Sequence, residues 1–542
     1  AGSRLWDQAL DLRLAYEVIC EVPIELPEGA APLPWAFDLG DIPDDLDNLF
    51  DQTSLLRVLV PLNQCTGINL PPALRSSDKQ RRLRELMRVA GTTDEDFFIT
   101  NFAYATYALG ELVRAPDKLG ARNPFTTSGV EYDDVTLDGS ILRLLADPIA
   151  ALQLRWYSDF RGETSDAKVL SLHTSRDELV IPANQSVLRE RIAPHRLTSA
   201  IVAESEPTHC GFSEAEGVSG WLALRDWIED DAAQPDAAVL QVQCTQLVGA
   251  GVDGPCRFDA TFDVPTIDSR IKPRPASIAP AVDAGYSGQW YDPSRVGEGI
   301  ALEILPGNRA LLYFFTYPPP GVTGNQAWLL GTGSVTGNGI AFEQMYRPVM
   351  VPNGNGGERL EQQPWGSLWL TFDDCRNGQM RWQGPPAWGS RDVTLERLTV
   401  LAGTGCIAPA APIAQPSGAW FDTRFFGNGF VIEQLDAART AALWFSPGTL
   451  ASGQTWMTGV LEGNIATGVA AQLLYRPSGP RFGAAFDPDQ FTTVPAMTIN
   501  LRLGCGLEGA GQYVTTPLLP GSGSPLQLER ITRPLGVPDC PK

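Results

Sequence analysis

Apolar residues recur every three or four positions in the first part of the chain, as expected for amphipathic helices. The clearest examples are RLWDQALDLRLAYEVI at 4–19, RRLRELMRVAG at 81–91 and FFITNFAYATYALGELV at 97–113. Stretches rich in proline and aspartate separate these segments. We therefore predict a large helical region over residues 1–145 that packs as a cap over another part of the molecule.

The pattern changes over residues 146–270, where helix-like and strand-like segments alternate. This alternation is typical of a parallel sheet with crossover helices, so the region is predicted to be α/β. Its end, after residue 233, is interpreted as a strand-rich tail that contains Cys244 and Cys256. The alternating segments are a helix at 146–162, a strand at 168–173, a helix at 181–192, a strand at 196–205 and a helix at 219–230.

The second half of the chain shows short apolar and aromatic runs punctuated by glycine and proline, a pattern typical of strands. The segment SGQWYDPSRVGEGIALEIL, with Trp290, matches SGAWFDTRFFGNGFVIEQL, with Trp420, at an offset of 130 positions. Further matches follow at nearly the same offset, which indicates a tandem duplication. We predict two tandem all-β domains, over residues 285–408 and 415–542.

A proline- and alanine-rich stretch, KPRPASIAPAVDA, precedes the repeats and has no apolar period. Such composition is typical of a linker, which we place at residues 271–284. The predicted fold is therefore multidomain: a helical cap over an α/β core, followed by two tandem all-β domains.

The charge of the chain excludes several classes of partner. The formal net charge is -22, and a surface of that sign repels nucleic-acid phosphates and anionic membranes. No apolar run is long enough to span a membrane. Residues 1–20 lack the pattern of a signal peptide, so we expect that any leader was removed before position 1.

Nine cysteines are spaced as local pairs rather than as the C-x-x-C pairs of zinc sites. Disulfides form in oxidising compartments, so we predict a secreted or periplasmic protein. Cys210 is left over as the odd cysteine. The four predicted pairs are Cys20 with Cys65, Cys244 with Cys256, Cys375 with Cys406, and Cys505 with Cys540.

An acid and a histidine follow the two predicted strands of the α/β region. Asp177 lies in the polar turn TSRDE after KVLSLH, and His209 lies in EPTHC after the next strand. The order and the separation of 32 residues suit the last two members of a serine-hydrolase triad, in which the acid orients the imidazole.

These residues lie in segments that resemble a known family. HTSRDELVIPANQ and THCGFSEAEGVSGWLALRDWI resemble the acid and histidine loops of secreted α/β-hydrolase-fold serine esterases and peptidases. AGSRLWDQALDLRLAYEVIC resembles the segment after the nucleophile strand, so that the likeness covers residues 1–270. It implies that Asp177 orients the base and that His209 is the general base and then the general acid. The nucleophile and oxyanion hole are expected before residue 1, since no G-x-S-x-G occurs in the 542 residues.

The tannase and feruloyl esterase family, a related group, joins the residue beside its serine to the one beside its histidine through a disulfide. That resemblance implies a disulfide partner for Cys210 upstream of residue 1. A buried free thiol explains the odd cysteine equally well.

Structural roles compete with the catalytic ones. An aspartate in a strand-to-helix loop often caps a helix. His173, close to Asp177, is a candidate hydrogen-bond partner of the acid loop, and His195 is interpreted as a surface residue.

The repeated modules contain aromatic residues that can stack on sugars or polymers, but their alternation with other apolar residues favours core packing. Glu303 and Glu433 recur in register, but two carboxylates in separate domains are not expected to form an acid/base pair. The modules resemble uncharacterised repeats of secreted bacterial enzymes. The aromatic residues are Trp290, Tyr291, Trp328, Trp420, Phe421 and Trp456.

The sequence predicts the C-terminal portion of a secreted serine hydrolase that acts on small-molecule or polymeric carboxylic esters. Residues 1–542 alone are expected to be inactive. Two alternatives stay open: an exopeptidase of the same superfamily, and a non-enzymatic adhesion protein whose β-modules bind a polymer. No cofactor and no metal-ligand cluster are predicted.

Overall fold

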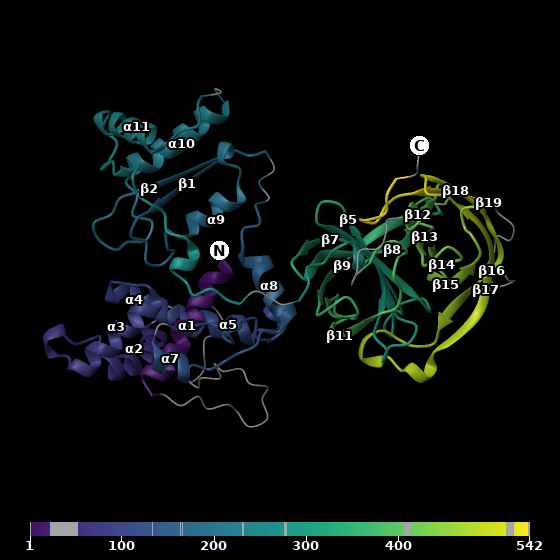
Figure 1. The fold of residues 1–542 in the computed structure, drawn as a ribbon, viewed down its shortest axis with the longest axis horizontal. Coiled ribbons are helices and arrows are strands. Elements are labelled where there is room, and N and C mark those ends of the chain that lie inside the picture. The colour runs from purple at the N-terminus through teal and green to yellow at the C-terminus, as the bar shows by residue number, and fades with distance from the viewer. Residues whose placement is uncertain are drawn as a thin grey trace. The chain divides into compact units, whose positions relative to one another are not determined.

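Two compact units, residues 1–276 and residues 277–542, make up the chain (Figure 1). The division lies within the predicted linker, but Ile271 and Arg274 belong to the packing of the first unit. Ile271 is 2% exposed and packs against Ile181 and Ala183. The computed structural model describes residues 2–21, 52–132, 134–162, 164, 166–229, 232–275, 279–405, 413–425, 427–515 and 525–539.

The first part of the first unit is helical, as its apolar spacing predicts. The predicted helical segment 97–113 is helical throughout and includes one π-helical turn, Tyr104–Ala108. No helix in the described part of the chain combines the length and the apolar character needed to cross a bilayer. The helices are α1 Gly2–Ile19, α2 Gln52–Thr66, α3 Ser77–Ala90, α4 Glu95–Ala103, α5 Leu109–Arg114, α6 Pro116–Leu119, α7 Val135–Ser140 and α8 Pro148–Ser158, with a short 3₁₀ turn at Pro72–Leu74.

Helix α1 is the centre of this region, because it packs against α3, α4, α5, α7 and α8. Leu10 and Leu14 are essentially fully buried in the shared core. The predicted disulfide between Cys20 and Cys65 is present and ties the end of α1 to α2. Because α1 buries apolar area against several helices, its position within the first unit is strongly stabilised.

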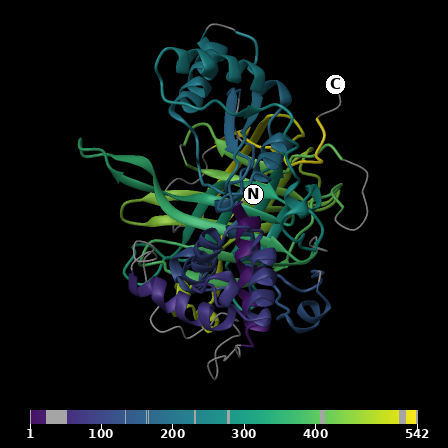
Figure 2. The same cartoon turned by 90° about the vertical axis from the view of Figure 1, so that its left-hand side faces the viewer.

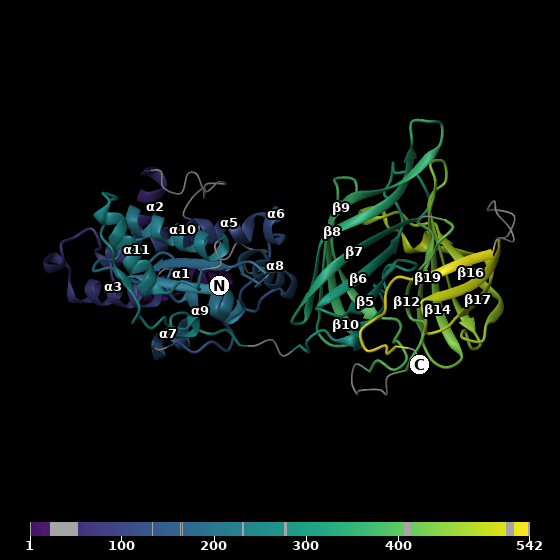
Figure 3. The same cartoon turned by 90° about the horizontal axis from the view of Figure 1, so that it is seen from above.

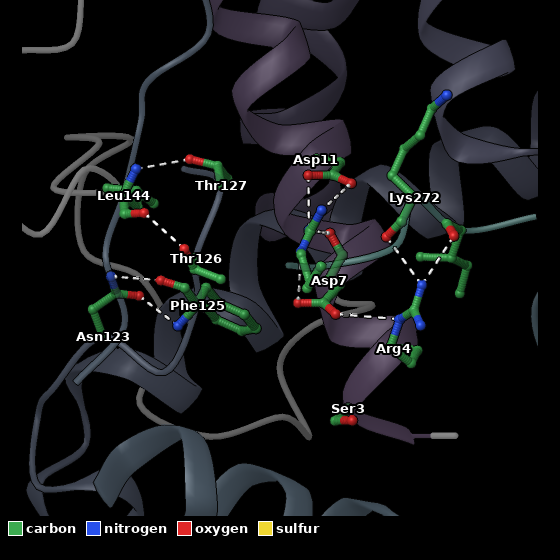
Figure 4. A network of polar contacts seen from close by, with 12 residues as sticks. Ser3, Arg4, Asp7, Asp11, Asn123, Phe125, Thr126, Thr127, Leu144 and Lys272 are labelled. Atoms are coloured by element: carbon green, nitrogen blue, oxygen red, sulfur yellow. Dashed lines mark hydrogen bonds and ion pairs between the residues drawn. The ribbon is translucent and has the colours of Figure 1, made fainter. Parts of the chain in front are cut away.

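A buried polar network fixes α1 to the chain that follows the α/β region (Figure 4). Arg274 donates to both carboxylate oxygens of Asp11, at 3.1 and 2.9 Å, and its Nε lies 3.2 Å from Asp7. Arg4 donates to the carbonyl of Lys272 at 3.0 Å. Burial raises the pKa of Asp7 to about 6, although the nearby Arg274 guanidinium acts in the opposite direction. Charged groups are tolerated at this buried position because the carboxylates of Asp7 and Asp11 are paired with the guanidinium of Arg274.

The α/β part contains the predicted parallel strands. β1 Val169–Thr174 pairs in parallel with β2 Leu197–Val202, with His173 opposite Ile201. Helix α9 Asn184–Arg191 and the 3₁₀ turn Pro194–Arg196 form the crossover between them. Helix α10 Glu214–Glu229 follows and packs against β1.

The segment after residue 233 corrects the prediction of a strand-rich tail. It forms helix α11 Ala237–Gly249 and only a two-residue strand, β3 Phe258–Asp259, which pairs antiparallel with β2. The alternating VLQVQ looks strand-like, but Leu240 and Cys244, four residues apart, are the positions that α11 buries. Cys244 is bonded to Cys256, as predicted.

The second unit consists of two closed eight-stranded antiparallel sheets, in agreement with the predicted tandem all-β region. The first sheet contains β4 Gly288–Tyr291, β5 Gly299–Leu305, β6 Arg309–Thr316, β7 Ala327–Thr336, β8 Gly339–Pro352, β9 Glu358–Phe372, β10 Asn377–Gln383 and β11 Ser390–Arg397. The second contains β12 Gly418–Asp422, β13 Gly429–Gln434, β14 Arg439–Thr449, β15 Gly453–Glu462, β16 Val469–Ser478, β17 Thr492–Leu503, β18 Glu508–Thr515 and β19 Pro525–Arg530.

Disulfides in the second unit differ from the prediction. Cys375 carries a free thiol, so the predicted pair with Cys406 is wrong, and Cys406 lies outside the described residues. Instead, Cys375 packs against the core of the first sheet. Cys505 is disulfide-bonded, and its predicted partner Cys540 also lies outside the described residues.

The two sheets interlock through their long connections. The β8–β9 hairpin extends well beyond the other strands of its sheet (Figure 2 and Figure 3). In the opposite direction, Phe482 from the β16–β17 connection is buried in the interior of the first sheet. Its ring centroid lies 4.7 Å from that of Trp388 and 5.1 Å from that of Trp382. Phe482 of the second module therefore completes the interior of the first sheet, and Glu358 of the β8–β9 hairpin accepts the N–H of Leu450, which follows β14, at 3.3 Å.

A reciprocal set of hydrogen bonds joins the outer faces of the two sheets. Gln326 Nε2 donates to the Trp456 carbonyl, and Gln454 Nε2 donates to the Trp328 carbonyl, both at 2.8 Å. The indole of Trp328 donates to the Ser446 carbonyl at 2.9 Å. Both tryptophans belong to one apolar cluster with residues of both sheets. The predicted tandem domains thus share a core.

Candidate functional site

The acid loop and the histidine loop leave the same end of the parallel strand pair, which brings Asp177 and His209 together. An isolated parallel β-bridge between Asp177 and Thr208 joins the two loops, and the Thr208 N–H donates to the Arg176 carbonyl at 3.1 Å. Carboxyl ends of parallel strands meet at one edge of a sheet, where binding residues commonly gather.

Asp177 uses both of its carboxylate oxygens. Oδ1 accepts the backbone N–H groups of Leu179 at 3.0 Å and Val180 at 2.8 Å, while Oδ2 lies 2.9 Å from His209 Nδ1. The residue is 4% exposed. Asp177 therefore caps its loop and contacts the histidine, so the capping role and the orienting role coexist.

His209 is held by Asp177 at Nδ1, and its side chain is partly exposed. Because a carboxylate can only accept, the contact with Asp177 requires the proton on Nδ1, which leaves the Nε2 lone pair to act as a base. The His209 side chain is 40% exposed. An imidazole fixed in this tautomer beside solvent can accept a proton from a bound hydroxyl or water.

Cys210 follows the histidine with a left-handed backbone, φ 53°. Its Sγ lies 3.9 Å from His209 Nδ1 and 3.7 Å from Nε2. Because these distances are nearly equal, the sulfur does not lie along the Nε2 lone pair, so the thiol is not aligned as a nucleophile. Cys210 is free and exposed, which corrects the alternative of a buried thiol.

Ion pairs and hydrogen bonds of Arg257 stabilise the histidine loop. Arg257 donates to the Gly211 carbonyl at 2.7 Å and to Glu204 at 2.5 Å, and it also donates to Glu216 at 2.9 Å. Burial alone would raise the pKa of Glu216, but hydrogen bonds from Arg257 and from the Ser213 N–H lower it below its ordinary value. Glu216 therefore stays charged and fixes the start of α10.

The site offers few ligands for a metal ion. Donor atoms of Asp177, His209 and Cys210 lie within 4.8 Å of one another. Asp177 Oδ1 already accepts two N–H groups and Oδ2 lies 2.9 Å from His209 Nδ1, so a metal ion would compete with these contacts for the carboxylate. The imidazole Nε2 and the thiol are the donor atoms not engaged with Asp177, and they are fewer than the three or four protein ligands typical of zinc sites.

The other two histidines lie away from the pair. His173 Nδ1 contacts the carbonyl of the adjacent Thr174, the last residue of β1, and not the carboxylate of Asp177. His195 is exposed in the 3₁₀ turn before β2, as expected from the sequence.

The aromatic residues of the β-modules pack in the protein interior. Trp290 and Trp420 are 0% exposed, and Trp328 and Trp456 are buried between the sheets. Tyr291 and Phe421, which follow the first pair, are half-buried. The described residues thus provide no exposed tryptophan platform at these positions.

Glu303 and Glu433 belong to different sheets, but both lie at the interface between the two modules. Thr532 Oγ1 donates to Glu303 and Thr399 Oγ1 donates to Glu433, each at 2.5 Å and each across the interface. Burial raises the pKa of each carboxyl to about 7, and the charge of Glu433 adds to the effect at Glu303. No described base contacts either carboxyl, so they form a structural pair.

A cavity of about 420 Å³ lies beside His209 and was not predicted from the sequence. It is lined by residues of α1, by Tyr104 and by the acid loop, and it is open to solvent on one side. Leu5, Ala9 and Leu12 carried the only signal, because their spacing places them on one face of α1. That spacing also fits ordinary core packing.

No known family model matches the chain, and no curated protein matches it in sequence. Among solved structures, the chain is similar to Aeromonas veronii immune modulator A, with 9% identity and a TM-score of 0.13. The match covers 46% of this chain and 97% of that chain, and a score this low carries no argument about fold or function.

Proposed function

We propose that the chain is part of a secreted serine hydrolase that acts on carboxylic esters, with Asp177 as the orienting acid and His209 as the base. The observation that carries this proposal is the 2.9 Å contact between Asp177 Oδ2 and His209 Nδ1. It occurs where two neighbouring parallel strands end, and the His209 side chain is 40% exposed.

In the proposed reaction, a serine oxygen attacks the ester carbonyl while His209 Nε2 takes the hydroxyl proton. The bond to the alcohol oxygen breaks, and the alcohol leaves with that proton. Water then attacks the acyl-serine and gives a proton to Nε2, which returns it to the departing serine oxygen. Ester and water are converted into acid and alcohol, with no electron transfer and no cofactor. We place the serine in the polypeptide before residue 1.

Asp177 supports the charged intermediate of this cycle. When His209 accepts a proton it becomes an imidazolium, and the buried carboxylate at Nδ1 stabilises that charge. Because Oδ1 is held by two backbone N–H groups, the carboxylate cannot rotate away from the ring without losing them. Disulfides between Cys20 and Cys65 and between Cys244 and Cys256 support the proposed extracytoplasmic location.

The test replaces His209 in the natural polypeptide that contains residues 1–542 and measures hydrolysis of simple carboxylic esters. His209→Ala should lower kcat/KM by on the order of 10³-fold or more. The matched control is His195→Ala, which removes an exposed histidine outside the site and should leave the rate unchanged. Equal rates for the His209→Ala variant and the natural protein would contradict the proposal, as would serine-type ester turnover by residues 1–542 alone.

A further inference from the structure

The cavity beside His209 has the size and position of a substrate pocket. Its volume of about 420 Å³ lies within the range of roughly 300–1,000 Å³ found for small-molecule sites. His209 is one of its lining residues, so a group bound in the cavity lies next to the base.

One wall of the cavity is apolar and belongs to α1. Leu5, Trp6, Ala9 and Leu12 line it from this helix. The polar network around Arg274 holds α1 from another side of the helix, so the apolar wall is fixed in place. A wall of this kind offers dispersion contacts and no charge.

The facing wall is tied directly to the candidate acid. Leu179 and Val180 line the cavity, and their backbone N–H groups are the two that Asp177 Oδ1 accepts. The carboxylate that orients His209 therefore also sets the position of two apolar side chains. Asp177 therefore positions both the imidazole of His209 and part of the cavity wall.

Three polar side chains of the lining, those of Glu178, Asn101 and Gln8, make hydrogen bonds within the protein. Glu178, 8% exposed, accepts the N–H groups of Thr93 at 2.8 Å and Asp94 at 3.1 Å, and also the Thr93 hydroxyl. Asn101 Nδ2 donates to the Glu178 carbonyl at 2.9 Å. Gln8 Nε2 donates to a backbone carbonyl at 2.6 Å.

The charge of the cavity discriminates among substrate classes. No lysine or arginine is among its described lining residues, so a substrate carboxylate would meet no cation and would face Glu178. A substrate ammonium would be attracted by Glu178, but this carboxylate already accepts three hydrogen bonds, so it would offset little of the cost of removing water from the ammonium. An uncharged hydrocarbon group has neither cost.

We propose that this cavity binds the uncharged, apolar aryl or alkyl part of the ester substrate, an inference that rests on the proposed function. It excludes the charged terminus of a peptide from the same place. The chain would then select neutral esters with a bulky apolar group rather than the substrates of an exopeptidase.

Three probes that share one aromatic group test the charge preference without any turnover. They are 4-phenyl-2-butanone, which is neutral, 3-phenylpropanoate, which is an anion, and 3-phenylpropylammonium, which is a cation. Binding to residues 1–542 is measured by calorimetry and by ligand-observed NMR. The neutral ketone should bind at least tenfold more tightly than either ion. Equal binding of all three, or no binding of the ketone, would overturn the inference, and tightest binding of the cation would favour the exopeptidase.

Two variants locate the binding. Ala9→Trp fills the cavity from α1 and should abolish binding of the ketone, whereas Val60→Trp adds the same side chain at an exposed position and should not. Leu5→Ala, which removes wall contacts without adding volume, should weaken binding several-fold if Ala9→Trp does not fold. Unchanged binding in a folded cavity variant would overturn the inference. Failure here leaves the rate loss of His209→Ala intact, so the two proposals fail separately.

Discussion

Two sets of buried carboxylates in this chain face different partners. Asp177 contacts a partly exposed imidazole, where two parallel strands end. Glu303 and Glu433 face threonine hydroxyls inside the interface of two closed sheets. A carboxylate beside an imidazole can orient that base, whereas burial raises the pKa of Glu303 and of Glu433 although the threonine hydroxyls act in the opposite direction. Burial alone therefore does not identify a candidate catalytic acid, and the partner of the carboxylate has to be considered as well.

The largest expected effect separates the two sets by activity. Asp177→Asn keeps an oxygen for the Leu179 and Val180 N–H groups but no longer fixes the tautomer of His209. Ester hydrolysis by the natural polypeptide should fall by on the order of 10³- to 10⁴-fold. Steady-state kinetics with Glu303→Gln as the matched control should show no loss. A comparable loss in both variants would erase the distinction.

The next effect concerns the interface that holds Glu303 and Glu433. Trp456→Ala removes a 3%-exposed indole between the sheets and should lower the stability of the second unit by about 3–5 kcal/mol. Hydrogen exchange of β14 and β15 amides in the full chain reports this loss. The control is Trp221→Ala, whose side chain is 67% exposed on α10. Protection of β14 and β15 that survives Trp456→Ala would show that the sheets do not depend on each other.

A pH effect should appear for the glutamates. Burial raises the pKa of Glu303 and of Glu433 from 4.5 to about 7, so the folded protein binds these protons more tightly than the unfolded chain. The stabilisation is complete below pH 4.5 and is lost as the pH rises through 7. It amounts to on the order of 3 kcal/mol for each carboxyl.

Glutamine variants isolate that effect. Glu303→Gln and Glu433→Gln keep an acceptor for the threonine hydroxyls, so in urea unfolding they should be more stable than the natural protein at pH 8 and closer to it at pH 5. Glu508→Gln, at an exposed position of β18, is the control. If the natural protein and the variants show the same pH dependence, the two carboxyls do not carry the buried protons.

The smallest effect concerns the strained residue beside His209. Cys210 has φ 53°, which glycine adopts without the steric cost that a Cβ adds. Cys210→Gly should stabilise the first unit by about 1 kcal/mol, and Cys210→Ala should not. Urea titration of the two variants measures the difference. Equal stability would mean that the backbone at this position carries no strain.

Several features could be predicted from the sequence because they are local. The helical spacing predicted α1, and the constant offset predicted two modules of the same type. Asp177 and His209 could be paired because each follows a strand and parallel strands end together. Their catalytic role is still a prediction.

Other features depend on residues that are distant in the sequence. Glu303 meets Thr532 only through the packing of one closed sheet on the other, which no local pattern encodes. The cavity walls combine α1 with a loop around Leu179. The alternation in α11 was misassigned because a short VLQVQ pattern fits strand and helix alike.

The reciprocal contacts of Gln326 and Gln454 have a consequence for the ancestry of the second unit. Gln326 of the first module donates to Trp456 of the second, and the equivalent Gln454 of the second module donates to Trp328 of the first. Two identical subunits related by a two-fold axis form interfaces of this isologous kind. A single ancestral module could therefore have been a homodimer, and fusion of two gene copies would have made its assembly independent of concentration. Once fused, the halves were free to diverge, as the exchange of Phe482 in one direction and of the β8–β9 hairpin in the other illustrates.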